Sequence, residues 1–518
     1  MKKIQSWSKI IYSCIYLFIA IFFVYGLTLT NSARELVSML MSLEKQGYVL
    51  LFIWGYVCLF LLLFKMRKNL ANFKRNDFLL FLIILASCPR IFVMCQNHYI
   101  PSNDFKWYYD VGVHLVEGDK AFVYEFLARY NITKFGGLAV FMGIIAKLFS
   151  VKLIGFQIAN IIITTFICVF IYLITENYNK KAAIIASILF AIYPENIISS
   201  QVTTNHHGAV LFALIGIFAL IKAEKGYRNR RTCYIICIVS GVALAISDFI
   251  HPSIIVPIIA VFCWGILDNK IQGEGIKKLA DLKFTKCILA ILVYAITMIL
   301  CFNMLKAGGI IGNDANTSQT LPLGKVVVGL NHETRGMWSQ EDSTATSDLT
   351  AEDKREWQKE QIKERVFDRP IKDFLSLMRD KADIVWFKQG SYFSWYWSEW
   401  YQELCNKNEA GVLSEDLAKE WEIFSVYSSY QLFDQIFLRI IYIFAILGLI
   451  MITMNRKRNA GIELAAWVLL GWILSHLLIE VQERYRYLGM PYIFIFAAIG
   501  VYECYRRLKL ICRRYLVK

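Results

Sequence analysis

Residues 153–175 read LIGFQIANIIITTFICVFIYLIT, which is 23 consecutive residues without a charged side chain. A helix needs about 20 apolar residues to cross the hydrocarbon core of a bilayer. Eleven further apolar runs are spread over the chain, at 10–27, 48–64, 78–95, 182–199, 208–222, 232–247, 252–267, 285–305, 432–454, 461–479 and 488–505. This series predicts an all-α polytopic membrane protein with about 12 transmembrane helices.

The composition supports this class and excludes others. Of the 518 residues, 57% are hydrophobic and only 19% are charged, whereas soluble domains are closer to half apolar and a quarter charged. A soluble protein of this length would need several domains with polar surfaces, for which the chain has too few polar residues. Intrinsic disorder, collagen and small disulfide scaffolds are excluded on the same grounds. Most of the 13 cysteines lie inside apolar runs without zinc-site spacing, so we interpret them as small hydrophobic residues.

The distribution of charge predicts which loops lie on which side of the membrane. The net charge of +15 comes from basic residues between the apolar runs, which indicates membrane topology rather than nucleic-acid binding. Twelve spans place every basic cluster in the cytoplasm. These clusters lie at 65–75, 180–181, 228–231, 277–286, 456–458 and 506–514. Residues 306–431 then lie on the outer side, and they carry 15 basic and 21 acidic residues, as the positive-inside rule favours.

The same topology divides the chain into three parts. Residues 1–305 form a transmembrane core with a first large external loop at 96–152. Residues 306–431 form a helical extracytoplasmic cap, and residues 432–518 contain the last transmembrane helices and a basic cytoplasmic tail. The apolar segment 135–149 has only about 15 residues, too few to cross, and counting it as a span would invert every later loop. We interpret it as a helix in the outer interface.

The strongest local motif opens the first external loop, at residues 101–110, which read PSNDFKWYYD. Ser102 or Asn103 is suited to cap a helix of about 15 residues, and Gly118 is suited to end it. Asp104 would lie in the first turn of this amphipathic helix, close to the outer end of the third span. The residues alone leave two interpretations open, an acid that favours the helix dipole and a catalytic acid.

Asp104 and its surroundings resemble the GT-C superfamily of membrane glycosyltransferases, among them the protein O-mannosyltransferases and the bacterial aminoarabinose transferases that act on lipid A. Members carry an acidic residue at the start of the first external loop, inside a short amphipathic helix. Further short motifs agree in order and membrane depth, and together they cover residues 78–510. These motifs are Lys134-Phe135-Gly136-Gly137 through Ser150, Ile192-Tyr193-Pro194-Glu195, Leu330-Asn331 through Gly336-Met337-Trp338, and Glu483-Arg484-Tyr485-Arg486-Tyr487 followed by Pro491.

The sequence departs from the family pattern at two places. Asn103 stands where many members carry an Asp or Glu beside the catalytic acid. The triplet Asn-His-His at 205–207 stands where many members carry a further acidic residue. If the reaction requires a second carboxylate, this chain supplies it from another position or works without it.

The resemblance implies that a sugar passes from a polyprenyl-phosphate carrier to an acceptor hydroxyl on the outer face of the membrane. The hydroxyl needs a base, and Asp104 is the candidate at the right depth. The charge of the leaving phosphate needs cations. Arg484 and Arg486 are the candidates because they lie at the outer end of a span, against the positive-inside trend. The alternatives are snorkelling or pairing with Glu480 and Glu483.

Five further residues complete the predicted substrate site. Lys134 and His251 are weaker candidates for the phosphate, and His251 is equally suited to cap a turn between two spans. Tyr108 is a candidate for stacking on the sugar, with interfacial anchoring as the alternative. Asn103 and Tyr485 are the remaining predicted substrate-binding residues.

We predict no bound metal or other cofactor. The alternative is a divalent ion held by His206 and His207 together with Asp104 or His251. Adjacent histidines rarely point at one ion, and the histidines of this chain show no i,i+4 pair, so hydrogen-bonded loop histidines are the preferred interpretation.

The resemblance therefore implies an inverting glycosyltransferase in a bacterial cell membrane, with an extracytoplasmic active site. Its partners would be a polyprenyl-phosphate sugar donor, an acceptor glycan, lipid or protein of the cell envelope, and membrane lipid. Two other classes stay open. A lipid-linked-sugar flippase predicts inverted repeats, which the sequence lacks, and charges near the bilayer midplane, whereas the charges of this chain lie at the outer edge. The main exception is Asp248, which lies near the outer end of the seventh span. An envelope polysaccharide polymerase or ligase would use a diphosphate-linked donor and would not need Asp104.

Overall fold

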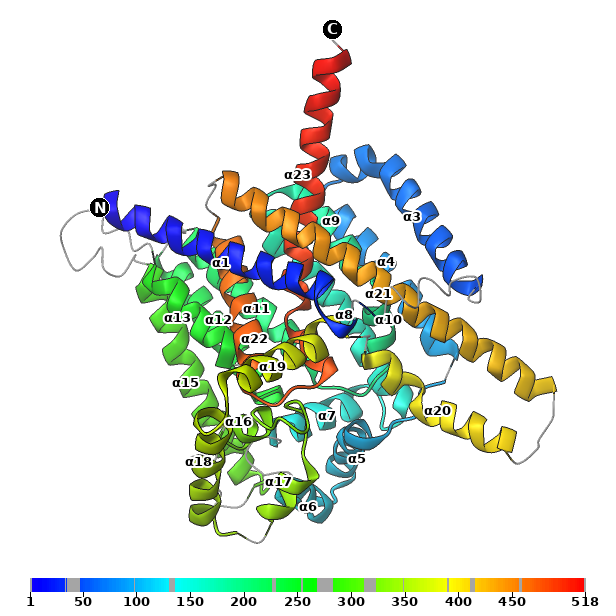
Figure 1. The fold of residues 1–518 in the computed structure, drawn as a ribbon, viewed down its shortest axis with the longest axis vertical. Helices are drawn as coiled ribbons and strands as arrows, with labels where there is room; N and C mark the ends of the chain where they lie inside the picture. Colours follow the sequence, from blue (N-terminus) through cyan, green and yellow to red (C-terminus); the bar gives the residue numbers. More distant parts are fainter. Residues whose placement is uncertain are drawn as a thin grey trace.

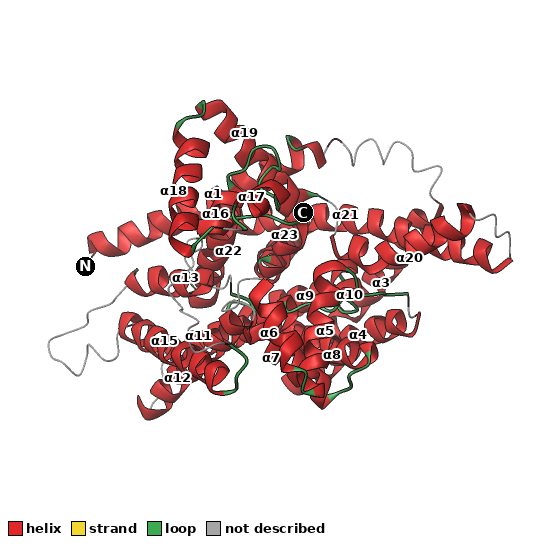
Figure 2. Cartoon of the chain, turned by 90° about the horizontal axis from the view of Figure 1, so that it is seen from below, coloured by secondary structure: helices red, strands yellow, loops and turns green. Residues whose placement is uncertain are grey.

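The chain folds into helices and connecting loops (Figures 1 and 2). The computed structural model describes residues 2–32, 34, 47–96, 98–129, 136–225, 230–252, 255–267, 283–311, 323–347, 349–388, 391–409, 415–455 and 459–516. No strand occurs in these ranges. The all-α class predicted from the apolar runs is confirmed.

Nine helices in the described ranges are long and apolar enough to cross a membrane, and they coincide with nine of the predicted spans. They are α1 (Lys2–Thr28), α3 (Gly47–Asn72), α4 (Arg75–Gln96), α8 (Leu153–Glu176), α11 (His206–Glu224), α12 (Arg230–Ile250), α15 (Lys283–Ala307), α21 (Glu415–Asn455) and α22 (Ala460–Leu478). The chain is therefore an all-α, multi-pass membrane protein.

The other three predicted spans take different forms. The run 182–199 is split into α9 (Lys180–Ala191) and α10 (Pro194–Ser199), because Pro194 cannot donate a backbone hydrogen bond and starts a new helix instead. The run 252–267 contains only the 12-residue helix α13 (Ile255–Ile266), and 488–505 lies in α23 (Met490–Leu516). The total of twelve spans stays a prediction.

Small residues bring the transmembrane helices into backbone contact. A Cβ atom built on Gly448 of α21 would lie 2.1 Å from the carbonyl oxygen of Phe496 on α23. A Cβ atom on Gly500 of α23 would lie 2.0 Å from the carbonyl oxygen of Phe444 on α21. This close crossing is typical of membrane helices, which gain van der Waals contact where side chains are small.

The remaining elements lie together at one end of the molecule (Figure 1). The predicted first external loop contains α5 (Asn103–Glu117), α6 (Lys120–Arg129) and α7 (Gly136–Leu148), the last of which corresponds to the predicted interfacial segment 135–149. The second forms α16 (Leu323–Gly329), α17 (Gln340–Ala345), α18 (Ala351–Phe367), α19 (Ile371–Ala382), the π-helix η3 (Asp383–Phe387) and α20 (Ser391–Glu409). The short 3₁₀ helix η4 (Glu483–Leu488) joins α22 to α23.

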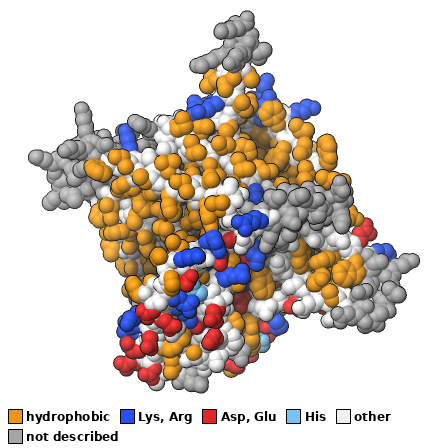
Figure 3. Space-filling view, viewed as in Figure 1, with side chains coloured by type: hydrophobic (Ala, Val, Ile, Leu, Met, Phe, Trp, Pro, Cys, Tyr) orange, Lys and Arg blue, Asp and Glu red, His pale blue; other side chains and the backbone are white. Residues whose placement is uncertain are grey.

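The surface agrees with this division. In Figure 3 hydrophobic side chains cover the middle of the visible face, Lys and Arg side chains gather above them, and charges of both signs gather below, over the cap. A hydrophobic band between two polar ends is the surface that a protein spanning a bilayer presents.

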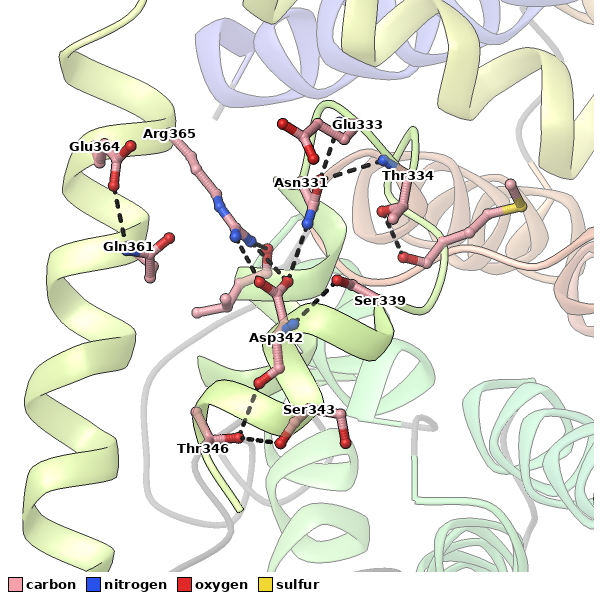
Figure 4. A network of polar contacts seen from close by, with 12 residues as sticks. Asn331, Glu333, Thr334, Ser339, Asp342, Ser343, Thr346, Gln361, Glu364 and Arg365 are labelled. Atoms are coloured by element: carbon pink, nitrogen blue, oxygen red, sulfur yellow. Dashed lines mark hydrogen bonds and ion pairs between the residues drawn. The ribbon is translucent and has the colours of Figure 1, made fainter. Parts of the chain in front are cut away.

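A buried ion pair connects three helices of the cap to one another (Figure 4). Arg365 on α18 donates to both carboxylate oxygens of Asp342 on α17, at 2.7 and 3.0 Å, and to the carbonyl of Val327 on α16, at 2.7 Å. Asn331 donates to the same carboxylate at 3.2 Å. Burial opposes the ionisation of Asp342, but the hydrogen bonds from Arg365 and Asn331 outweigh it and lower the pKa of the carboxyl group. The network holds α16, α17 and α18 in one unit.

A buried lysine connects the cap to the transmembrane bundle through hydrogen bonds. Lys381 on α19 is fully buried, and its ammonium group donates to the carbonyl of Gly329, at 2.6 Å, and to that of Leu477 on α22, at 2.7 Å. These bonds fix the end of α16 beside the end of α22, where the segment containing η4 begins.

Candidate functional site

Helix α5 carries Asp104 in its first turn, as predicted. The helix starts after Ser102, which has extended backbone, and stops at Gly118, whose φ of 84° belongs to the left-handed region that glycine favours. The predicted side-chain cap is absent, because Ser102 makes no cap hydrogen bond and its hydroxyl lies 3.5 Å from that of Ser398 on α20. Asn103 has a φ of 45° and an exposed side chain.

The segment 480–486 reaches four different parts of the molecule through its charged side chains. The four ion pairs are Glu480 with Lys325 of α16, Glu483 with Lys388 at 2.6 Å, Arg484 with Asp104 of α5, and Arg486 with Glu195 of α10 at 2.8 Å. The segment therefore joins the cap, the first external loop and the bundle at one place.

Asp104 and Arg484 meet although 380 positions separate them in the sequence. Nη2 of Arg484 donates to Oδ2 of Asp104, and the aspartate side chain is 39% exposed whereas the arginine side chain is 4% exposed. In the described part of the chain, Nε and Nη1 of Arg484 are buried and have no hydrogen-bond partner. A buried guanidinium with unused N–H groups is prepared to bind an anion, because leaving such donors unpaired costs free energy.

Aromatic side chains surround the Arg484 guanidinium. Its central carbon lies 4.9 Å from the ring centre of Phe105, 5.7 Å from that of Trp395 and 5.9 Å from that of Tyr485. Cation–π contacts of this kind hold an arginine in place without using its N–H donors. Tyr108 lies one turn after Asp104 on α5; burial raises the pKa of its hydroxyl, and Arg484 opposes this rise.

His251 joins this group from the connection between α12 and α13. Its ring centre lies 4.7 Å from that of His206, and its Nε2 is buried without a partner in the described ranges. Burial lowers the pKa of His251 to about 3, and the positive charges of Arg484 and Lys325 add to the effect. A neutral imidazole beside two cations can accept or donate a hydrogen bond but adds no charge.

Arg486 makes different contacts from Arg484. It is fully buried, with Nε and Nη2 on one carboxylate oxygen of Glu195, at 3.2 and 2.8 Å, and Nη1 on the carbonyl of Lys388, at 2.6 Å. Tyr193 also donates to Glu195, at 3.0 Å. Neither Glu480 nor Glu483, the partners considered from the sequence, pairs with either arginine in the ion pairs found here.

The remaining residues near this group are one predicted candidate that cannot be placed and one acid that lies outside the group. Lys134 lies outside the described residues. Asp110 pairs with Lys106 at 2.6 Å on the exposed side of α5, away from Asp104. The local sequence does not single out Lys325, Trp395 or Glu195, because each acts through a partner that is distant in the sequence.

The residues considered for a metal ion point to different partners. Nδ1 of His206 lies 2.5 Å from the hydroxyl of Tyr392, and Nε2 of His207 lies 2.8 Å from the carbonyl of Ser199. Within the described ranges, no group of three or more His, Cys, Asp or Glu side chains is placed to hold a metal ion.

Comparisons with known proteins add a likeness to solved structures. No family model matches the chain, and no curated protein matches it. The apo oligosaccharyltransferase of Archaeoglobus fulgidus is similar with a TM-score of 0.43 and 12% identity, over 85% of this chain and 52% of that one. The same enzyme in complex with Zn and sulfate has a TM-score of 0.43 and 12% identity, over 83% of this chain and 50% of that one. Its complex with an inhibitory peptide and a dolichol-phosphate has a TM-score of 0.41 and 13% identity, over 86% of this chain and 52% of that one. This chain spans about half the length of that enzyme.

Proposed function

We propose that this chain is a GT-C-type membrane glycosyltransferase. It transfers a sugar from a polyprenyl-phosphate-linked donor to a hydroxyl group of a cell-envelope glycan, lipid or protein on the extracytoplasmic face. The observation that carries the proposal is the pairing of Asp104, a partly exposed carboxylate, with Arg484, a buried guanidinium whose Nε and Nη1 have no hydrogen-bond partner among the described residues. A base and an anion-binding group side by side are what this reaction requires.

The transfer follows from these two groups in one displacement step. The acceptor oxygen attacks the anomeric carbon of the sugar while its proton passes to a carboxylate oxygen of Asp104. The bond between the anomeric carbon and the phosphate oxygen breaks, and its electron pair leaves with the polyprenyl phosphate. Arg484 stabilises the charge that this phosphate gains. Attack opposite the leaving group inverts the configuration at the anomeric carbon.

The other residues of the group have supporting roles in this proposal. Tyr108, Tyr485 and His251 line the space around Arg484 and supply hydrogen-bonding groups for the sugar and phosphate. Arg486 holds η4 against α10 through Glu195, which fixes the position of Arg484 two residues earlier. Asn103 and Lys134 are additional candidates for contacts with the substrate.

The test is sugar transfer by the purified chain in nanodiscs. Radiolabelled sugars on polyprenyl phosphate serve as donors, crude envelope fractions serve as acceptors, and parallel reactions with and without EDTA test for a divalent metal. Asp104→Asn should lower the transfer rate by about 100-fold or more, the usual contribution of a general base. Asp110→Asn is the control, because Asp110 lies on the same helix and pairs with Lys106 outside the site.

Two results would contradict the proposal. Transfer by Asp104→Asn at the wild-type rate would exclude Asp104 as the base and favour a polymerase or ligase that uses a diphosphate-linked donor. Movement of labelled donor across the bilayer, without transfer and without dependence on Asp104, would identify a flippase.

A further inference from the structure

We propose that Lys325, on the cap helix α16, is a second cation that binds the donor phosphate, and that Glu480 is the internal anion that occupies Lys325 before the phosphate binds. This inference rests on the proposed function. It adds to Arg484 a residue from a separate part of the chain, so that the cap contributes directly to the phosphate site.

Lys325 and Arg484 act on the same small volume. Burial raises the pKa of Tyr485 and Glu480 adds to this, whereas Lys325 and Arg484 both oppose it. Both cations also disfavour the protonated form of His251. The geometry agrees, because Lys325 pairs with Glu480, which belongs to the same segment 480–486 as Arg484 and donates its amide hydrogen to the carbonyl of Lys325. We infer from this placement that one bound phosphate contacts both cations.

The exposure of the two cations differs in a way that suits binding. The Lys325 side chain is 49% exposed, whereas those of Glu480 and Arg484 are each 4% exposed. Lys325 is thus the cation at the surface of the site, and Arg484 is the one inside it. A lysine ammonium group on its flexible four-carbon stem can exchange one oxygen partner for another without a change in the backbone.

The backbone beneath Lys325 is fixed independently of its side chain. The amide of Glu480 donates to the carbonyl of Lys325 at 2.7 Å, and the amide of Val481 donates to the carbonyl of Gly336 at 2.8 Å. Arg365 holds the next turn of α16 through the carbonyl of Val327. The Lys325 ammonium group can therefore leave Glu480 while the cap stays attached to the segment that carries Arg484.

The charges of the site compensate each other in two pairs, Asp104 with Arg484 and Glu480 with Lys325. A phosphate that contacts both cations competes with Glu480 for Lys325. On Arg484 it can use Nε and Nη1, which have no partner among the described residues, while Nη2 stays on Asp104. The phosphate and the base are then held by the same guanidinium.

The two partners of the Lys325–Glu480 pair should respond differently when donor binding is measured. The probe is a fluorescent short-chain polyprenyl monophosphate without sugar, titrated against the full chain in nanodiscs. Lys325→Met should weaken binding about 10- to 100-fold, as expected for the loss of a hydrogen bond between charged groups. Lys325→Arg should retain most of the affinity. Glu480→Gln should bind equally well or up to about fivefold tighter, because it removes a competing anion.

Controls separate the phosphate from the lipid chain and from the fold. Unlabelled polyprenyl monophosphate should compete with the probe, whereas the corresponding alcohol, which has no phosphate, should not. Lys359→Met breaks an exposed pair with Glu356 (2.6 Å) elsewhere on the cap and should leave the affinity unchanged. Thermal unfolding midpoints show whether each variant is folded. If Lys325→Met does not fold, the affinity of Lys325→Arg still tests the proposal.

Three outcomes would overturn the inference. If Glu480→Gln weakens binding as much as Lys325→Met, the pair is only a structural connection between the cap and the segment 480–486. If Lys325→Met binds like wild type while Arg484→Met does not, the phosphate contacts Arg484 without Lys325, and the proposed function survives alone. If neither wild type nor any variant binds the probe, the inference and the proposed donor class both fail.

Discussion

Arg484 and Arg486 show how two residues of the same type take different roles at the scale of single side chains. Both lie in η4, a 3₁₀ helix with about three residues per turn, so side chains two positions apart point in different directions. Arg484 donates to Asp104 through Nη2, and its Nε and Nη1 have no partner among the described residues, whereas Arg486 uses all its nitrogens on Glu195 and a carbonyl. The proposed function assigns substrate binding to Arg484 and a structural role to Arg486.

Lys381 predicts a pH dependence of stability. Burial lowers the pKa of its amine to about 7 in the fold, against about 10.4 in an unfolded chain. Below pH 7 both states are protonated, and the fold bears the full cost of burying the charge. Between pH 7 and about 10 the unfolded state binds more protons, so the free energy of unfolding should rise with pH, by at most about 1.4 kcal/mol per unit. Thermal unfolding midpoints at pH 6.5 and 9 measure this rise.

The Lys381→Met variant should lose most of this rise. The reference variant is Lys372→Met, which removes an exposed lysine from the same helix and should behave like wild type. A wild-type midpoint that is equal at pH 6.5 and 9, or a rise that persists in Lys381→Met, would show that another group controls the pH dependence. The neutral form of Lys381 fits its surroundings, because a neutral amine has two N–H donors and Lys381 contacts two carbonyl groups.

Some site residues follow from the sequence and others do not. The helix position of Asp104 follows from local signals within about 15 residues of chain. The different contacts of Arg484 and Arg486 do not follow from the sequence, because they depend on 3₁₀ geometry and on Glu195, which is 291 positions from Arg486. No local sequence pattern distinguishes Lys325 from other exposed lysines, because its partner Glu480 is distant in the sequence.

At the scale of elements, the crossing of α7 and α12 depends on Gly137. A Cβ atom built on Gly137 would lie 1.8 Å from the carbonyl oxygen of Phe249, near the end of α12. We predict that Gly137→Ala separates the two helices and destabilises the fold by about 1–3 kcal/mol, the usual cost of overpacking. Because α7 packs on α5 and His251 follows α12, sugar transfer should fall as well.

Gly55→Ala is the matched control for this prediction. Gly55 lies in α3, and a Cβ atom on it would meet no atom within 4 Å. Alanine there should stabilise the helix by up to about 1 kcal/mol. Unfolding midpoints in detergent compare the two variants. Equal midpoints for Gly137→Ala and wild type would mean that the α7–α12 crossing relaxes without cost.

The sequence predicts these elements well where the signals are local. The bounds of α5 agree with the expectation because an extended residue precedes the helix and Gly118 ends it. The single span expected at 182–199 is wrong in detail, since Pro194 interrupts it and α10 starts there. Hydrophobicity alone does not distinguish one span from two shorter helices when both are buried.

At the scale of the whole molecule, the predicted orientation can be measured directly. Lys359→Cys places a thiol on the exposed face of α18 in the cap, and Lys509→Cys places one near the end of α23. We predict that a membrane-impermeant maleimide labels the first variant in intact cells and the second only after the membrane is permeabilised. Wild type, with its own 13 cysteines, supplies the background. The reverse pattern would invert the topology and place Asp104 on the cytoplasmic side.

The arrangement of the whole molecule is the part that sequence patterns describe least. The apolar runs and the basic clusters predict spans and sides because each depends on a short stretch of chain. The contacts of the cap with the bundle depend on single groups far apart in the sequence, such as Lys381 on the carbonyl of Leu477. No local pattern marks such a lysine as buried rather than exposed.

The distance between Asp104 and Arg484 along the chain has a consequence for biosynthesis. The aspartate leaves the ribosome 380 residues before its arginine, which at 5–20 residues per second is roughly 20 to 80 s. Under the predicted topology, the first external loop is translocated during that interval, before its partner has been made. Under the proposed function, newly inserted protein is then inactive until the segment 480–486 is synthesised, and translational pausing late in the message would delay activity without altering membrane insertion.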